Sequence, residues 1–186
     1  MELIGIAESI QSSGLAEWLR TSLKAIPIIE AVHVMAITIV FGTILIVDLR
    51  LLGFPSTRRA FTRVSRELLG WTWAAFVVAV ITGALMFVAD AVTYYNNTPF
   101  RLKMLALVIA GINVAIFHGI TERGVAAWDK DSPTPAAARA AGAISIATWV
   151  VVIFLGRWIG FVSTYDFEVP KDIQFDFDFP ADDSKP

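Results

Sequence analysis

Residues 25–52 read AIPIIEAVHVMAITIVFGTILIVDLRLL, and the 17 positions between Glu30 and Asp48 carry a single ionisable side chain, His33. About 20 apolar residues are enough for a helix to cross the hydrocarbon core of a membrane. The run therefore predicts a transmembrane helix. An ionisable residue inside such a helix is costly, so His33 is by default a candidate for a functional site.

The composition extends this prediction to the whole chain. Hydrophobic residues make up 56% of the 186 residues, charged residues only 17%, and the mean hydropathy is +0.64. This balance is too apolar for a soluble domain and predicts an integral membrane protein with no nucleic-acid partner. The absence of cysteine excludes disulfides, iron–sulfur clusters, thiolate zinc sites and covalently attached haem.

Four apolar runs predict four membrane-spanning helices. The connections between them are short and contain Gly, Pro or Asn, which predicts antiparallel neighbours. The predicted fold is all-α, a transmembrane four-helix up-down bundle over residues 25–163. The predicted spans are Ala25 to Leu52, Gly70 to Tyr95, Pro99 to Ile120 and Arg139 to Ser163.

Positive charges are concentrated in the first and third connections, which predicts that both face the cytoplasm. Both termini then lie outside, on the periplasmic side of the inner membrane if the host is a Gram-negative bacterium. The basic residues of these two connections are Arg50, Arg58, Arg59, Arg63, Arg66, Arg123, Lys130 and Arg139.

The two flanking segments differ in character. Residues 1–24 mix apolar and charged side chains, which predicts one or two amphipathic helices at the membrane surface, with a frayed terminus as the alternative. Residues 164–186 alternate aromatic and acidic residues, which is typical of an extended strand laid on a partner or of a disordered tail. Their negative charge suggests a docking element for a basic external redox protein.

His33 and His118 are the only histidines. A rise of 1.5 Å per residue places His33 roughly 12 Å and His118 roughly 28 Å below the outer ends of their spans. Axial ligands of one iron need nearly equal depths, so the difference of about 16 Å weakens a site that both residues share. We expect two separate sites for a haem or metal ligand.

Other polar residues are predicted near each histidine. Glu30, Lys103 and Arg157 belong to the outer layer around His33, where the two cations could bind the propionates of a haem; alternatively the three charges neutralise one another. Asp48 belongs to the inner layer around His118. In a non-redox alternative, His33 pairs with Glu30, and His118 with Asp48 or a backbone carbonyl.

Several short motifs together resemble a family of bacterial four-helix membrane proteins of unknown function. The resemblance covers most of residues 15–163. In general plan that family is similar to small b-type cytochromes and to the membrane domain of copper-resistance D-type proteins, which implies His33 and His118 as ligands of haem or metal. Small b-type cytochromes supply four histidines, and this chain has two. The motifs are Glu30-Ala-Val-His33, Asp48-Leu-Arg-Leu-Leu-Gly53, Trp71-Thr-Trp73, Tyr94-Tyr95, Phe100-Arg-Leu-Lys-Met104, Phe117-His118 and Gly156-Arg157-Trp158.

The leading hypothesis is a membrane protein that binds one or two molecules of haem b and transfers electrons between a quinol or a cytoplasmic donor and an external acceptor. In a cyclic dimer, His33 and His118 could each meet their own copies at equal depth and bind two haems. The second hypothesis is a non-redox anchor for an external enzyme. A metal or solute transporter ranks lowest, because the sequence has no inverted repeats and no ladder of methionines.

Overall fold

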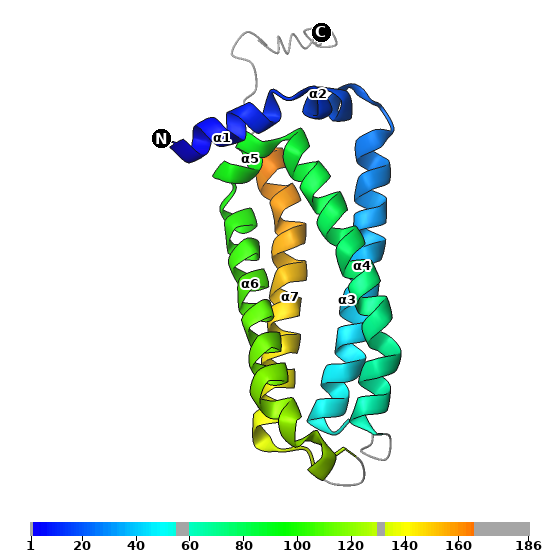
Figure 1. The fold of residues 1–186 in the computed structure, drawn as a ribbon. Helices are drawn as coiled ribbons and strands as arrows, with labels where there is room; N and C mark the ends of the chain where they lie inside the picture. The colour runs from blue at the N-terminus through cyan, green and yellow to red at the C-terminus, as the bar shows by residue number, and fades with distance from the viewer. Residues whose placement is uncertain (1, 55–59, 130–132, 166–186) are drawn as a thin grey trace, which may run out of the picture.

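The computed structural model describes residues 2–54, 60–129 and 133–165. In this part of the chain every regular element is helical, which confirms the all-α prediction. Figure 1 shows four long helices, with short helices at both ends. The elements are α1 (Glu2–Gln11), α2 (Gly14–Thr21), α3 (Ala25–Leu52), α4 (Phe61–Ala89), α5 (Ala91–Asn96), α6 (Thr98–Ile116), the π-helix η1 (Phe117–Thr121), the 3-10 helix η2 (Glu122–Ala127) and α7 (Ala136–Tyr165).

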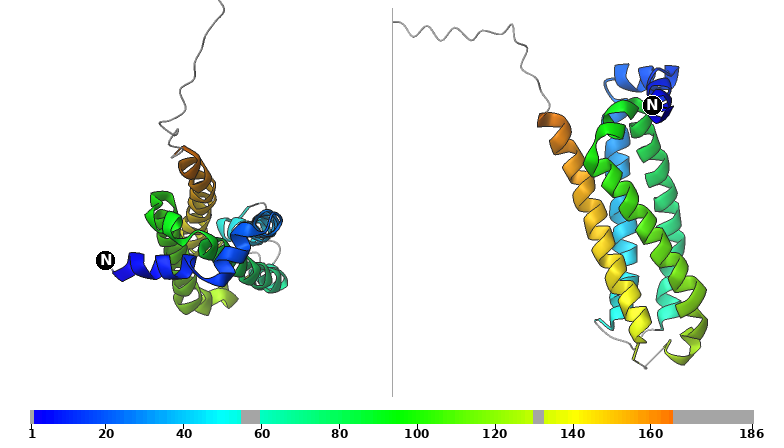
Figure 2. Two further views of the ribbon diagram at one scale, coloured as in Figure 1. Left: turned by 90° about the horizontal axis from the view of Figure 1, so that it is seen from above. Right: turned by 90° about the vertical axis from the view of Figure 1, so that its left-hand side faces the viewer.

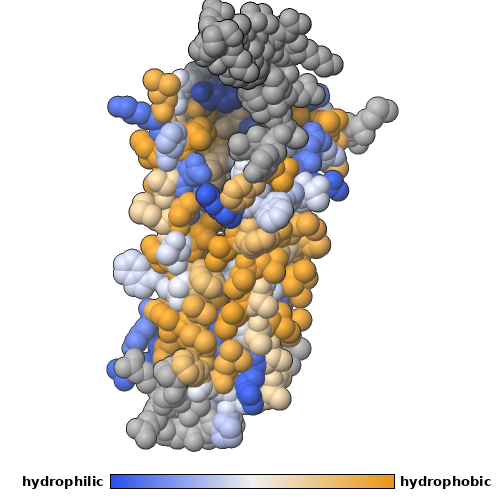
Figure 3. All heavy atoms as spheres, turned by 180° about the vertical axis from the view of Figure 1, so that it is seen from behind, coloured by the Kyte–Doolittle hydropathy of each residue, from blue (hydrophilic) through white to orange (hydrophobic). Residues whose placement is uncertain are grey.

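Four of these helices, α3, α4, α6 with its continuation into η1, and α7, are long and apolar enough to cross a membrane. Between 11% and 33% of each apolar stretch is buried within the chain, so most of their side surface is left for lipid or for another protein. Figure 3 shows the result on one face, an apolar middle with hydrophilic residues gathered toward the two ends.

The four long helices are arranged as two packed pairs. The most extensive contacts are those of α3 with α4 and of α6 with α7, and contacts of α3 with α7 join the pairs. In contrast, α4 and α6 make few or no contacts in the described part of the chain. Figures 1 and 2 show the two pairs running side by side, with α1, α2 and α5 across one end. We call this the terminal end and the opposite one the loop end.

Local sequence explains where α3 and α6 stop and start. Gly53 ends α3 in a left-handed conformation with φ of 86°, which a residue with a Cβ rarely adopts. The side chain of Asn97 accepts a hydrogen bond from the backbone N–H of Phe100, and Pro99 occupies the first turn of α6. The first span was predicted from Ala25 to Leu52, and α3 has the same two ends, so this prediction is confirmed.

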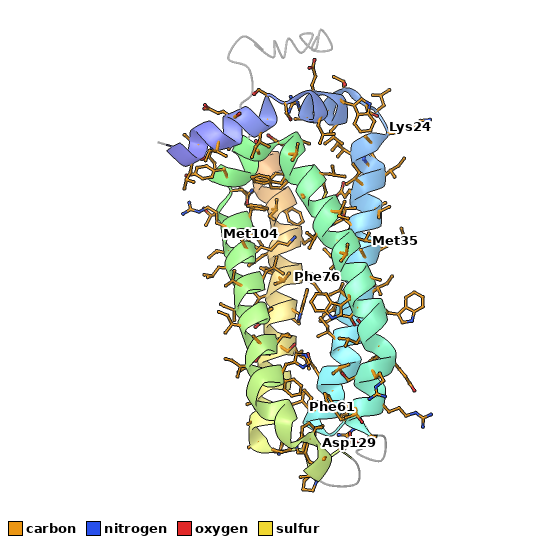
Figure 4. The ribbon with its side chains drawn as sticks, viewed as in Figure 1. Lys24, Met35, Phe61, Phe76, Met104 and Asp129 are labelled. Atoms are coloured by element: carbon orange, nitrogen blue, oxygen red, sulfur yellow. The ribbon has the colours of Figure 1, made fainter. Side chains whose placement is uncertain are left out.

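The second predicted span, Gly70 to Tyr95, is wrong at both ends. The helix begins at Phe61, because Asp129 supplies acceptors from the other side of the loop end: its carbonyl accepts from Phe61 N–H at 2.9 Å and its carboxylate from Thr62 N–H at 2.8 Å. Arg50 donates to the same carbonyl at 2.9 Å. Figure 4 shows Phe61 and Asp129 together at this end. The helix stops at Ala89, and residues 91–96 form the separate helix α5.

The other two spans differ from prediction by smaller shifts. The α-helical part of the third ends at Ile116 and passes into the π-helix η1, instead of continuing to Ile120. The fourth runs from Ala136 to Tyr165, longer than the predicted Arg139 to Ser163. Asn113 bonds across α6 and α7 through Nδ2, which lies 3.0 Å from the carbonyl oxygen of Ala141.

Two helices, α1 and α2, form a layer across the terminal end. Of the one or two helices predicted for residues 1–24, the structure thus has two. This layer is tied to α4 and α5 by two long-range bonds. Oε1 of Gln11 accepts from Val92 N–H at 2.8 Å, and the guanidinium of Arg20 donates to the carbonyl of Ala89 at 2.7 Å. The acidic segment 166–186 lies outside the described residues, so its predicted role is not addressed by the fold.

Candidate functional site

His33 lies eight residues into α3 and faces α4. Its Nδ1 is 2.8 Å from Oγ1 of Thr82, which is itself a buried residue. The same hydroxyl lies 2.7 Å from the carbonyl oxygen of Val78 and 3.2 Å from that of Ala79. A carbonyl can only accept, so the single hydroxyl proton of Thr82 points at the backbone of α4.

This geometry decides how the imidazole is protonated. Because the Thr82 proton is already donated to the backbone, its oxygen accepts a hydrogen bond from Nδ1–H of His33. The neutral ring then carries its proton on Nδ1 and its free lone pair on Nε2. Metal-binding histidines commonly have this arrangement, in which a second group orients the ring and fixes the tautomer.

Gly83 lets the ring lie close to the backbone of α4. A Cβ at this position would be 3.1 Å from Cε1 and 3.9 Å from Nε2 of His33. The ring is thus held on one face by α4 and on its edge by Thr82. His33 is half-buried inside its own chain, whereas Met35, two residues away, is 60% exposed and points outward (Figure 4).

Lys103 on α6 lies within electrostatic range of His33. Its side chain extends toward α7, where a Cβ on Gly156 would lie 3.3 Å from the ammonium Nζ. Within the described part of the chain, this ammonium group has no ion pair and no hydrogen bond to a carboxylate or carbonyl. The site therefore combines an imidazole with a lone pair on Nε2 and a cation without an ion pair among the described residues.

The predicted outer layer of charges is only partly assembled. Glu30 is exposed and lines a hollow near the terminal end, one helical turn beyond His33. Arg157 is exposed on the outside of α7, with its guanidinium carbon 5.5 Å from the centre of the Phe161 ring. Of the three predicted partners, Lys103 lies within electrostatic range of His33, and no hydrogen bond or ion pair joins His33 to Glu30 or Arg157 in the described part of the chain.

His118 lies near the loop end, in the π-helix that ends the third span. Its ring is exposed and meets that of Phe117 edge-to-face, with centroids 5.6 Å apart. Since His33 is eight residues from the start of α3 and His118 is twenty from the start of α6, the two lie at different levels, separated by roughly 18 Å along the bundle.

Asp48 lies on the α7 side of α3, where Ser145 donates a hydrogen bond to its carboxyl group. Its side chain is 6% exposed, and Oδ2 has no hydrogen-bond partner among the described residues. The hydrogen bond that the structure shows for this carboxyl group is thus the one from Ser145, and the pairing of His118 with Asp48 or a backbone carbonyl stays a prediction. No group of three or more His, Asp or Glu residues could hold a metal ion in the described ranges.

The hollow beside Glu30 has a volume of about 310 Å³ and was not predicted. Its other polar residues are Arg20, Asp90 and Tyr94, which come from three separate segments. The pKa of Tyr94 is raised, first by burial and then by the negative charges of Asp90 and Glu30. The spacing of Glu30 and His33, which puts both on one helix face, is the one sequence signal that points toward this hollow. Thr82 and Gly83 offered no comparable signal, because both residues are common in membrane helices.

Comparison with known proteins identifies one family. Residues 22–162 match a family described as "Family of unknown function (DUF6644)", a range that includes α3, α4, α6 and α7 up to residue 162 and leaves out α1 and α2. No curated protein and no solved structure matches the chain.

Proposed function

The chain belongs to the DUF6644 family, and we propose that it is a haem b-binding protein of the bacterial inner membrane that transfers electrons between a quinol and an external acceptor. Haem iron changes by one electron at a time, whereas a quinol oxidised to the quinone releases two electrons and two protons. The haem would supply the redox chemistry, and the protein residues would bind, orient and shield it.

The observation that carries this proposal is the hydrogen bond between His33 and Thr82. At 2.8 Å, Thr82 holds the Nδ1–H and leaves the Nε2 lone pair of a buried neutral imidazole without a proton. Axial histidines of haem proteins bind iron through such a nitrogen, and a second group on the other ring nitrogen fixes their orientation. Gly83 beside the ring keeps a side chain from filling this space.

Lys103 is the residue suited to a haem propionate. It lies within electrostatic range of His33 and has no ion pair in the described residues. The Arg157 side chain packs on Phe161 instead, so we assign Lys103 the larger role.

His33 faces the interior of its own chain, which favours one haem per chain at this level over a pairing of His33 with its copy. His118 is different, because its exposed ring could meet its copy across the axis of a cyclic dimer and bind a second haem there. We further propose that the spans form an up-down bundle with the terminal end outside. The excess of Arg and Lys at the loop end supports this orientation.

The proposal is tested by expressing the full chain with excess haem and measuring the reduced-minus-oxidised spectrum and the haem content of the purified protein. His33→Ala is expected to abolish the haem band at this site. His118→Ala should remove at most a second, separate haem. Met35→Leu, on the outward side of the same helix, is the matched control and should retain full haem content. Haem content unaffected by His33→Ala would overturn the proposal.

A second candidate is a non-redox anchor for an external partner enzyme. The layer formed by α1 and α2 across the terminal end favours it, because exposed apolar residues of this layer, including Leu3, Ile6, Leu15 and Trp18, are available to lipid or to a partner. In this case the bond between His33 and Thr82 serves only to join α3 and α4. A fully folded preparation that stays colourless with excess haem would support this candidate.

A further inference from the structure

The hollow near the terminal end lies directly beyond His33. It is lined by Ile26 and Glu30 on α3, by Met86 and Ala89 on α4, and by Arg20, Asp90 and Tyr94. Glu30 precedes His33 by three residues and lies one turn closer to the terminal end, a rise of about 4.5 Å. Figure 1 shows α2, which carries Arg20, across the top of α3 and α4. A molecule bound here would thus be adjacent to the His33 site.

The polar groups of the hollow are mostly hydrogen-bond acceptors. The carboxylates of Glu30 and Asp90 make no ion pair and no hydrogen bond within the described part of the chain. Arg20 is held in place by its bond to the carbonyl of Ala89 at 2.7 Å. The ring of Tyr94 packs against Phe87 and Phe100 with centroids 6.2 and 5.1 Å apart, which fixes the phenol between the two acidic residues and the bundle.

We propose that this hollow binds the head group of a membrane quinol, with Glu30 and Asp90 accepting hydrogen bonds from its two hydroxyl groups. The apolar side chains of Ile26, Met86 and Ala89 also line the hollow and suit the ring. The location at the ends of the spans lets an isoprenoid tail remain in the lipid. This inference assigns a binding site to the quinol of the proposed electron transfer and rests on that function for its biological role.

The hydrogen-bond acceptors of the hollow favour the reduced form, the quinol, over the oxidised form, the quinone. A quinol has two O–H donors, whereas the quinone has none and would place two carbonyl oxygens against two carboxylates. A divalent cation fits less well, because Arg20 brings a positive charge and no group of three or more acidic or histidine ligands is found in the described ranges. A zwitterionic lipid head group is the competing occupant, and the experiment separates it from a quinol.

The test uses the full chain in nanodiscs of phosphatidylglycerol, titrated calorimetrically with decylubiquinol held reduced under argon. The double variant Glu30→Gln with Asp90→Asn is expected to weaken binding about tenfold or more, since hydrogen bonds to charged acceptors contribute roughly 1.5–3 kcal/mol each. Ile26→Trp, which fills the hollow without changing charge, should also weaken binding. Glu67→Gln at the loop end, where Glu67 pairs with Arg63 at 3.2 Å, is the control and should bind as the unmodified chain does.

Equal affinity in the double variant and the unmodified chain would overturn the inference. So would loss of decylubiquinol binding when phosphatidylethanolamine is added, because a lipid head group would then be the occupant. Haem content and quinol binding of the unmodified chain separate the two proposals. An unmodified chain that stays colourless with excess haem and still binds decylubiquinol supports this site and overturns the haem proposal, whereas a haem protein that does not bind decylubiquinol does the reverse. In His33→Ala, quinol binding should persist while the haem band is lost.

Discussion

Nδ1 of His33 on α3 lies 2.8 Å from Oγ1 of Thr82 on α4, and the same hydroxyl lies 2.7 Å from the carbonyl oxygen of Val78. The chain of donors therefore runs from the imidazole to the threonine and from the threonine to the backbone. Two helices are joined by this chain, and one ring nitrogen of His33 is left with a free lone pair. The consequences of this bond can be measured separately from the loss of the histidine itself.

Thr82→Val keeps the size of the side chain and removes the acceptor for Nδ1–H. The ring is then free to change tautomer or to rotate, so haem affinity is expected to fall about 10- to 100-fold, as is typical for loss of a group that orients a ligand. Thr82→Ser retains the hydroxyl and should stay close to the unmodified chain. Haem titration of the three purified proteins makes the comparison. Identical affinities for the valine and serine variants would show that the bond has no orienting role.

Gly83→Ala tests the space beside the ring. The added methyl would be 3.1 Å from Cε1 of His33, so the ring must move by a few tenths of an ångström. We expect a shifted haem spectrum and reduced haem content. Gly111→Ala is a matched control, because nothing lies within 4 Å of its Cβ position and alanine stabilises a helix by up to about 1 kcal/mol relative to glycine. An unchanged spectrum in Gly83→Ala would argue against binding at this face.

Asp48→Asn addresses the buried carboxyl group on the other side of the bundle. Oδ2 of Asp48 has no hydrogen-bond partner among the described residues, and the side chain is 6% exposed. Replacing the buried carboxylate by a neutral amide removes the cost of burying a charge, so the free energy of unfolding is expected to rise by about 1–3 kcal/mol. Ser145→Ala removes the donor that the described residues supply to this group and should lower the free energy of unfolding. Thermal unfolding in detergent measures the stability of both variants. A destabilised Asp48→Asn would indicate that the charge is needed.

The sequence was most informative where structure depends on local residues. The bounds of α3 follow from an apolar run that Gly53 ends in a left-handed conformation. The start of α4 could not be predicted in this way, because its acceptors come from Asp129, 67 residues later. A polar group that caps a helix from a distant loop leaves no periodic pattern around the helix itself.

The same difference between local signals and contacts of distant residues holds for the candidate site. His33 was identified because an ionisable residue in an apolar run is conspicuous, and Lys103 because it lies at a similar depth. The hollow was missed, since Arg20, Glu30 and Asp90 come together only when α2 lies across the ends of α3 and α4. The contact of Arg157 with Phe161 could not be predicted from depth, because depth alone does not tell which face of a helix meets its neighbours.

Tyr94 predicts a specific dependence on pH. Its pKa is raised, mainly by burial and further by Asp90 and Glu30, so ionisation is easier in the unfolded than in the folded chain. The contribution of Tyr94 to stability is therefore complete below about pH 10 and is lost as the pH rises beyond it. Tyr94→Phe should be as stable as the unmodified chain at neutral pH and more stable than it in alkali. Tyr95→Phe is the control. Ultraviolet titration of tyrosinate, together with unfolding measured at neutral and at alkaline pH, tests this prediction. An equal loss of stability in alkali for the unmodified chain and Tyr94→Phe would contradict it.

Asp129→Ala tests the cap at the loop end. The alanine variant loses the acceptors of Thr62 N–H at 2.8 Å and Thr62 Oγ1 at 2.9 Å, and it also removes a negative charge from the start of α4. The expected loss in the free energy of unfolding is about 1 kcal/mol, as for other helix caps. Asp129→Asn keeps one acceptor, so its free energy of unfolding should lie between those of the unmodified chain and Asp129→Ala.

The effect of Asp129→Ala should be local. Because the carbonyl that binds Arg50 and Phe61 N–H belongs to the backbone, it remains in every variant. The loss should therefore be confined to the first turn of α4, where hydrogen exchange of residues 61–65 is expected to quicken while the His33 site is unaffected. Faster exchange throughout α4 would instead mean that Asp129 holds the whole helix in place.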